Sequence, residues 1–158
     1  MYQEVKLELI FLLPIFLPFL TAIFLFLNKK LFNELITNFF TLNSALLSFA
    51  IAAYSFISLA LDKFKPVNVE LFQWISNPDI SIGFTLDGLS GIMLILVTGL
   101  SFVIQLFSTS YMEEDENHCN YFVYFNFFVF SMLLLVMSSN FLVMFFGWEL
   151  VGLSSYLL

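Results

Sequence analysis

Five long stretches of hydrophobic residues, separated by short polar segments, run through this chain. They cover approximately residues 7–27, 35–61, 86–112, 121–138 and 140–158. Because an α-helix rises about 1.5 Å per residue, roughly 20 apolar residues cross the hydrocarbon core of a bilayer. The pattern therefore predicts an all-α membrane protein with about five transmembrane helices in a single membrane domain.

Several residues add detail to these helices. Pro14 and Pro18 are expected to kink the first helix, which implies that other helices pack around it. The second stretch is longer than a bilayer requires, so it should tilt or project into water. Asp87 lies in the first turn of the third helix, where the simplest explanation is that its carboxylate caps the helix and complements the helix dipole.

The segment between the second and third helices has a different pattern. Apolar and polar positions partly alternate over residues 67–75 and 80–84, and the tetrapeptide Ser76-Asn77-Pro78-Asp79 between them is rich in turn-forming residues. We expect a short β-hairpin over about residues 67–84, lying on one face of the membrane.

The composition supports a membrane protein and excludes several functions. Of the 158 residues, 61% are hydrophobic and 11% are charged, whereas soluble domains are about half apolar and a quarter charged. The net charge of −7 argues against nucleic-acid binding. A single cysteine, Cys119, beside a single histidine, His118, provides no ligand set for zinc, haem or an iron–sulfur cluster. We place this pair in a polar loop and expect no cofactor in this chain, with metal binding by the pair as the weaker alternative.

The lysines give a weak indication of orientation. Lys29 and Lys30 favour the matrix or cytoplasmic side for the first loop, although Lys63 and Lys65 oppose this assignment. The hairpin is then expected on the opposite side, and the acidic loop at residues 113–117 on the same side as the first loop.

Glu149 is the most costly residue in the predicted helices, because it lies in the middle of the last one. Roughly 13 Å of helix separates it from either membrane face, which is too far for its side chain to reach water. A charged carboxylate at this depth costs about 2.5–3.5 kcal/mol on insertion scales. Glu149 must therefore be protonated, hydrated or paired with a cation.

No cation in this chain is well placed to pair with Glu149. The five lysines all lie between positions 6 and 65, and there is no arginine. Either Glu149 keeps its proton in apolar surroundings, or a lysine or arginine from another polypeptide or from a missing continuation of this one approaches it. Both situations are typical of a residue that transfers protons; the alternative is a structural polar contact that never titrates. Gly147 and Gly152 flank Glu149 and would admit a close partner helix, with Gly152 and Tyr156 on the face of Glu149.

Other polar residues inside the predicted helices are candidates to line a hydrated path. Most residues of these types in membrane helices bond across helices or to the backbone, so we expect the majority to be structural. The candidates are Asn43, Ser44, Thr98, Ser101, Gln105, Asn126 and Ser131.

The second half of the chain resembles a known family. The tract NFLVMFFGWELVGLSSYLL, which contains Glu149, is highly specific, and the segments LDGLSGIMLILVTGLSFVIQLFSTSYM and YFVYFNFF support it. Together they resemble the start of subunit 5 of respiratory complex I, an antiporter-like, proton-pumping membrane subunit of NADH:ubiquinone oxidoreductase. The first 65 residues match this family mainly in pattern.

The resemblance implies that Glu149 takes part in proton transfer, paired with a lysine on a later helix that lies outside this chain. It covers only the first third or so of the family's length, so we expect a split-off or partial subunit. The implied partners are membrane lipid and other complex I membrane-arm subunits, including a chain that carries the remaining helices. Relatives often carry His at the position of Gln105, Asp at Ser139, Gly at Leu150 and a basic residue near Asn120.

The leading hypothesis is thus a part of the proton-translocating membrane arm of complex I, in which NADH-to-ubiquinone electron transfer drives proton pumping. A structural scaffold without titration of its own is one alternative, and a homologous subunit of a Mrp-type sodium/proton antiporter or of a chloroplast-type dehydrogenase is another. The Phe-rich, arginine-free composition is typical of an A/T-rich organellar gene and favours the mitochondrial inner membrane.

Overall fold

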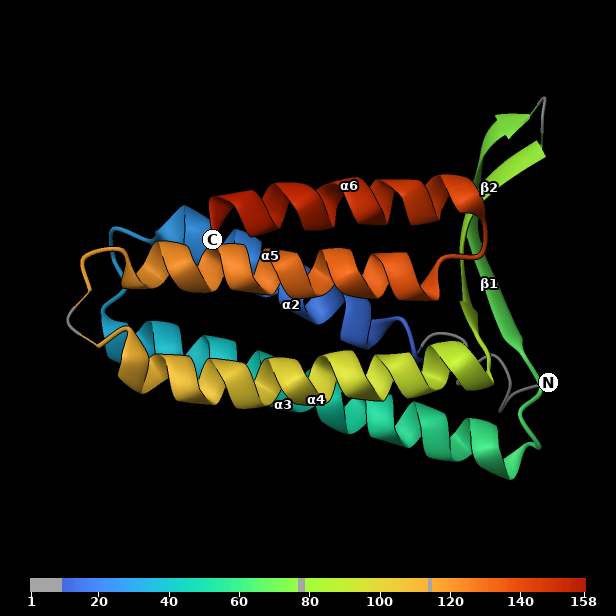
Figure 1. Ribbon diagram of the computed structural model, residues 1–158, viewed down its shortest axis with the longest axis horizontal. Coiled ribbons are helices and arrows are strands. Elements are labelled where there is room, and N and C mark those ends of the chain that lie inside the picture. Colours follow the sequence, from blue (N-terminus) through green and yellow to red (C-terminus); the bar gives the residue numbers. More distant parts are fainter. Residues whose placement is uncertain (1–9, 77–78, 114) are drawn as a thin grey trace.

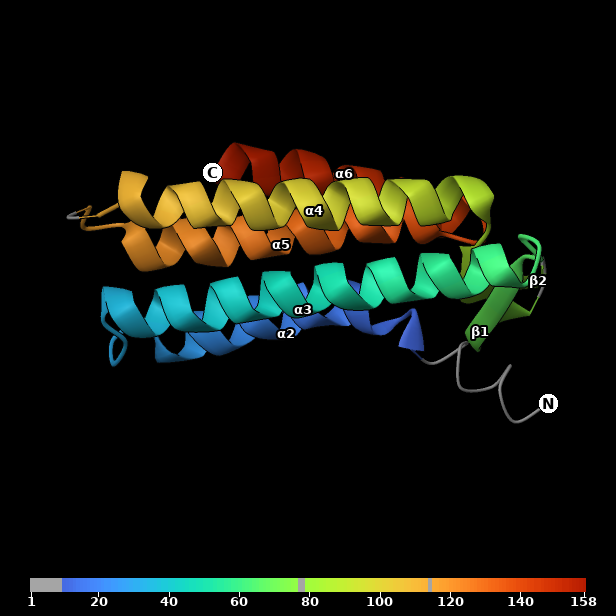
Figure 2. The same cartoon turned by 90° about the horizontal axis from the view of Figure 1, so that it is seen from below.

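The computed structural model describes residues 10–76, 79–113 and 115–158. Over these residues the chain forms five helices and one hairpin, in the order α2 (Leu13–Asn28), α3 (Glu34–Leu61), β1 (Val67–Ser76), β2 (Asp79–Leu86), α4 (Gly88–Tyr111), α5 (His118–Met137) and α6 (Phe141–Leu157). The helices run side by side along one axis, and the hairpin stands at one end of them (Figures 1 and 2). The predicted helical membrane fold with a hairpin before the third helix is confirmed.

The helices differ in length. Within the described residues, α3, α4 and α5 are long and apolar enough to cross a membrane, and α2 and α6 are apolar helices of 16 and 17 residues. At about 1.5 Å per residue the two short helices reach roughly 25 Å, most of the thickness of a hydrocarbon core. The α2–α3 and α4–α5 connections lie at the end opposite the hairpin, as the sequence predicts (Figure 1).

The start of α2 corrects the prediction for the first helix. The predicted helix begins at residue 7, but residues 7–9 lie outside the described part and α2 begins at Leu13. Pro14 occupies the first turn, where a missing N–H breaks no hydrogen bond, so only Pro18 lies inside the helix. Pro18 cannot donate to the carbonyl of Pro14, and the hydroxyl of Ser48 on α3 donates to that oxygen instead, at 3.3 Å.

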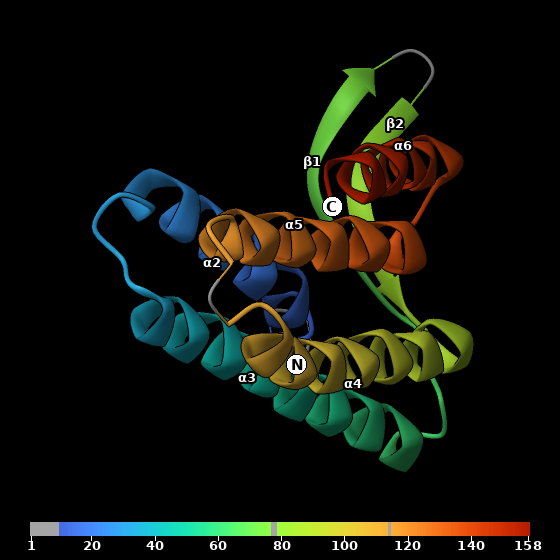
Figure 3. The ribbon, with the colours of Figure 1, turned by 60° about the vertical axis from the view of Figure 1, so that its left-hand side comes forward.

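The central helix of the bundle is α5, which contacts α2, α4 and α6, while α3 packs on α2 and α4 (Figure 3). Residues from several helices meet in one apolar core, which includes Ile15, Leu94, Leu133 and Met137. In contrast, α6 packs mainly on α5. One side of α6 is therefore left uncovered by the described part of the chain.

The hairpin is joined to the start of α6. Its antiparallel register runs from Val67 opposite Leu86 to Ser76 opposite Asp79, so the second strand extends two residues beyond the prediction, while residues 77–78 of the predicted turn lie outside the described part. Ser139 N donates to Gly83 O at 3.2 Å, which adds the α5–α6 connection to the edge of β2. A side chain at position 83 would come within 2.8 Å of Ser139 Oγ, so the glycine permits this contact.

Asp87 caps α4, as predicted. Its carboxylate accepts a hydrogen bond from Ser90 N at 2.8 Å, and Ser90 Oγ accepts one from Asp87 N at 2.7 Å. This reciprocal pair satisfies backbone donors that the first turn of a helix leaves free. The hydrogen bond from the Ser90 backbone is the main reason that the pKa of Asp87 lies below its usual value.

Asp87→Ala should lower the free energy of unfolding by about 1 kcal/mol, because Ser90 N loses its acceptor. Since the pKa of Asp87 is depressed in the folded chain, its contribution is complete above the unfolded pKa, near 4, and is lost as the pH falls through the folded pKa. Thermal unfolding in detergent, followed by circular dichroism at pH 7 and pH 3, measures both effects. Asp87→Asn keeps an acceptor and should remove this part of the pH dependence; an unchanged pH dependence in Asp87→Asn contradicts the prediction.

Candidate functional site

Glu149 lies in the middle of α6, with eight residues of the helix on either side. That spacing corresponds to about 12 Å of helix in each direction. Its side chain is exposed, and it makes no hydrogen bond or ion pair with any residue in the described part of the chain. The carboxylate therefore faces outward from the bundle at the depth of the apolar region.

Two glycines beside Glu149 have different surroundings. A Cβ at Gly147 would lie 2.6 Å from Leu135 N and 2.7 Å from Leu135 Cα, so this glycine allows α6 to approach the backbone of α5. A Cβ at Gly152 would meet no atom within 4 Å. The predicted close approach is thus made by α5 of the same chain at Gly147, and the space beside Gly152 stays open.

The outward face of α6 is mostly aromatic and aliphatic. Trp148 is 63% exposed and Tyr156 is 87% exposed, and Phe145 and Leu153 of the same helix are also exposed. A large apolar surface of this kind contacts lipid or another protein. A single carboxylate within it is the chemically distinctive group.

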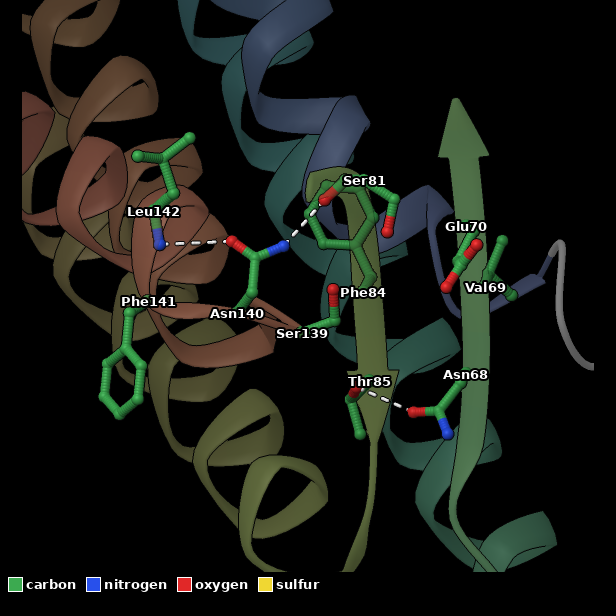
Figure 4. Close-up of a pocket in the computed structure, with 10 residues that line it drawn as sticks. All are labelled: Asn68, Val69, Glu70, Ser81, Phe84, Thr85, Ser139, Asn140, Phe141 and Leu142. Carbon is green, nitrogen blue, oxygen red and sulfur yellow. Dashed lines mark hydrogen bonds between the residues drawn. The ribbon is translucent and has the colours of Figure 1, made fainter. Parts of the chain in front are cut away.

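A cleft lies between the hairpin and the start of α6 (Figure 4). Hydrogen bonds of Asn140, which lines the cleft, attach the helix to the hairpin. Asn140 Nδ2 donates to Ser81 O at 2.6 Å, while Asn140 Oδ1 accepts from Leu142 N at 3.1 Å and from Val143 N at 3.0 Å. Asn140 therefore caps α6 and attaches it to β2 at the same time. Because the cap fixes the start of the helix, the hairpin sets the position of Glu149 along the membrane normal.

A second polar centre lies inside the bundle. Thr41 Oγ1 on α3 donates to Gln105 Oε1 on α4 at 2.6 Å, and Asn126 Nδ2 on α5 donates to Thr41 Oγ1 at 2.7 Å. All three side chains are buried. Sequence reasoning named Gln105 and Asn126 but missed Thr41, which the four-residue spacing of Thr37 and Thr41 on one helix face would have indicated.

The other predicted path residues have local partners. The hydroxyl of Ser44 accepts from Thr21 Oγ1 on α2 at 2.8 Å. Four side chains donate to carbonyls of their own helix four residues earlier: Asn43, Thr98, Ser101 and Ser131. These four are satisfied locally, as side chains of this type usually are in membrane helices.

Glu149 and the buried network do not meet. The contact of Gly147 with Leu135 sets the alignment of the antiparallel helices, so Glu149 lies opposite residues near position 133 of α5. Asn126 lies seven residues before position 133 on α5, about 10 Å away along the helix axis. It also belongs to the inner side of α5, whereas Glu149 points away from the bundle.

His118 and Cys119 form the first turn of α5 rather than a polar loop, which corrects the prediction. The predicted fourth helix begins at residue 121, but α5 begins at His118. The imidazole is 3% exposed, with its ring centroid 4.9 Å from that of Phe122 one turn later. The helix starts earlier because this turn has a buried side, which a hydropathy pattern does not reveal for histidine.

The fold and the outward carboxylate define a multi-helix membrane protein with one helix face that the described residues leave uncovered. Residues 72–122 match the family described as NADH-ubiquinone oxidoreductase (complex I), chain 5 N-terminus. By sequence, the chain is similar to the N-terminal part of proteins of this family.

Relatives with this name cover most of the chain. It is 37% identical over 153 residues to NADH-quinone oxidoreductase subunit L of Buchnera aphidicola, covering 96% of the chain and 25% of the relative. Subunit L of Escherichia coli is 35% identical over 92% of the chain and 24% of its own length. NADH-ubiquinone oxidoreductase chain 5 of Rhizopus stolonifer is 39% identical over 90% of the chain and 22% of its own length. The chain thus spans about a quarter of the length of these relatives.

A solved structure has the same fold. A chain in the membrane-bound sulfane sulfur reductase, described as an archaeal respiratory membrane complex, superposes with a TM-score of 0.81 at 21% identity, covering 94% of this chain and 29% of that chain. The arrangement of the helices and the hairpin is therefore an established architecture.

Proposed function

We propose that this chain is part of the proton-translocating membrane arm of an NADH–quinone oxidoreductase, to which it contributes Glu149. The observation that carries the proposal is a carboxylate midway along an apolar helix, on a face that residues 10–76, 79–113 and 115–158 leave uncovered. The relatives named chain 5 and subunit L support it. NADH oxidation and quinone reduction would belong to other parts of the assembly, with no cofactor held by this chain.

The partner of Glu149 in this proposal is a lysine outside the residues of this sequence, on a later helix. Among the described lysines, Lys29 and Lys30 lie between α2 and α3, and Lys63 and Lys65 lie between α3 and β1, at opposite ends of the bundle. None of these four lies at the depth of Glu149. The natural source is a membrane-arm subunit that carries the helices corresponding to the remainder of the relatives.

Proton transfer would then follow from the changing surroundings of one carboxylate. A carboxyl group in apolar surroundings holds a proton, because burial penalises the charged form. A lysine ammonium that approaches within about 4–6 Å favours the ionised carboxylate, so the proton leaves. Withdrawal of the lysine favours proton uptake by the carboxylate again. The direction of net proton transfer is set by which side of the membrane supplies water to the carboxylate when the lysine is near and when it is withdrawn.

A scaffold role is the second candidate, favoured by the exposed aromatic surface of α6. In that case Glu149 makes one fixed polar contact with a neighbouring subunit and keeps one protonation state.

The relative from Rhizopus stolonifer carries the chain 5 name, which supports the mitochondrial inner membrane as the proposed location, while the subunit L relatives are bacterial.

Co-assembly tests the proposed membership. Native membranes solubilised in mild detergent should yield this chain in a large complex that oxidises NADH with a quinone acceptor, separated on a native gel and detected by an antibody against the chain. Mass spectrometry of the same band should find sequence related to the later parts of subunit L. Migration of the chain apart from every NADH-oxidising band would contradict the proposal.

A further inference from the structure

His118 is a buried imidazole whose two nitrogens both lack a hydrogen-bond partner among the described residues. A buried polar group without a partner costs about 1–3 kcal/mol, so native proteins provide one, from the chain or from water. His118 therefore marks a place where a polar molecule is expected.

The same histidine lines a polar groove at the end of the bundle opposite the hairpin, between the α2–α3 and α4–α5 connections. Lys29, Glu34, Asp115 and Glu116 supply the charged groups of this groove. Thr37 also lines it, and its hydroxyl is buried without a partner in the described chain. The groove thus joins a charged, exposed surface to two buried polar side chains with free hydrogen-bonding capacity.

Polar groups continue from the groove into the bundle. Thr41 lies one turn beyond Thr37 on the same face of α3. It bonds to Gln105 and to Asn126, and Asn126 Oδ1 is buried without a partner among the described residues. Asn126 lies eight residues beyond His118 on α5, about 12 Å deeper in the membrane.

We propose that water molecules occupy this line, from the groove past His118 and Thr37 to Asn126, and form a proton-uptake path separate from Glu149. Water supplies both the donors and the acceptors that these atoms need, and a buried water typically makes about three hydrogen bonds. The hydration follows from the unpartnered atoms alone. Its use for protons rests on the proposed function.

The distribution of unpartnered atoms agrees with this path. Within the described residues, the buried side-chain atoms without partners belong to Thr37, Asn38, His118, Asn126 and Ser55. Thr37 and His118 line the groove, Asn38 is the next residue of α3 after Thr37, and Asn126 lies at the inner end of the path. Ser55 is the exception, since it lies towards the hairpin end of α3.

X-ray radiolytic labelling of the intact complex tests the hydration, because radicals formed from bound water oxidise the side chains beside it. Phe122 lies between His118 and Asn126 on α5 and is 0% exposed, and the matched control Phe11 is also 0% exposed. Phe122 should be oxidised at least tenfold faster than Phe11. Equal slow oxidation of both rings overturns the proposal.

Two variants extend this test. Thr37→Val should lower the oxidation rate of Phe122 several-fold, whereas Ser101→Ala, whose hydroxyl donates to Val97 O of its own helix, should not change it. Thr37→Val should also slow NADH-driven proton transport by the complex at least threefold. Suppose that Phe122 is labelled in the unaltered chain but Thr37→Val leaves proton transport unchanged. The path is then hydrated, and its proposed role in carrying protons is wrong. The labelling does not depend on pumping, so its outcome is separate from that of the proposed function.

Discussion

Glu149→Gln should lower proton transport by the assembled complex at least tenfold while leaving the chain in the complex. Glutamine keeps the size and most hydrogen bonds of glutamate but cannot release a proton, so the titrating step is lost and the packing is retained. The measurement is NADH-driven acidification of membrane vesicles, normalised to the amount of complex and compared with NADH oxidation by an artificial acceptor.

Two further substitutions complete this experiment. Asp62→Asn, at an exposed position just beyond α3, removes an equal charge and should leave transport unchanged. Glu149→Asp keeps a titrating carboxylate and should restore part of the activity. Normal transport and normal assembly in Glu149→Gln would rule out proton transfer by this residue, and loss of assembly would favour the scaffold role.

Gly147→Ala should reduce the stability of the α5–α6 pair by about 1–3 kcal/mol, the usual cost of overpacking a well-packed contact. The added Cβ would lie 2.6–2.7 Å from backbone atoms of Leu135, and backbone cannot move aside as a flexible side chain can. Unfolding of the purified chain in mixed micelles of rising denaturing-detergent content measures the loss of stability.

Gly152→Ala is the matched control, in the same helix and only five residues away. Its added methyl group meets no atom within 4 Å, so the isolated chain should lose no stability. In the complete complex the same substitution should weaken assembly if a partner helix lies against this face. Equal destabilisation of the isolated chain by both substitutions would contradict the assigned packing of α6.

Much of the fold could be predicted because hydrophobic length and turn chemistry act locally. The apolar stretches, the turn residues at 76–79 and the cap at Asp87 each predicted their element. The predicted first residues of α2 and α5 were less accurate. At α2 the first-turn proline determines where the helix begins, and at α5 a histidine on a buried side belongs to the helix although hydropathy places it in a loop.

The candidate sites were predictable to different degrees. The sequence singles out Glu149 as a candidate by its depth in the last apolar stretch and by the distance of the lysines from it, and its role stays a prediction. The Thr41–Gln105–Asn126 network depends on which helix faces meet. Gln105 and Asn126 lie 64 and 85 residues from Thr41 along the chain, and sequence alone does not specify contacts over such separations. Gly147 packs against α5 and Gly152 does not, and this difference also depends on which helix faces meet. The sequence alone does not distinguish the two glycines.

The one-sided packing of α6 also has a consequence for biogenesis. Under the proposed function, a newly inserted copy of the chain would expose Glu149 and its aromatic neighbours to lipid until a partner arrives, and an unpaired carboxylate in hydrocarbon is costly. The attachment of Asn140 to the hairpin fixes the start of α6 before that encounter, so the docking surface is already formed. Unassembled copies are therefore expected to turn over faster than assembled ones, which would let partner supply set the abundance of the chain.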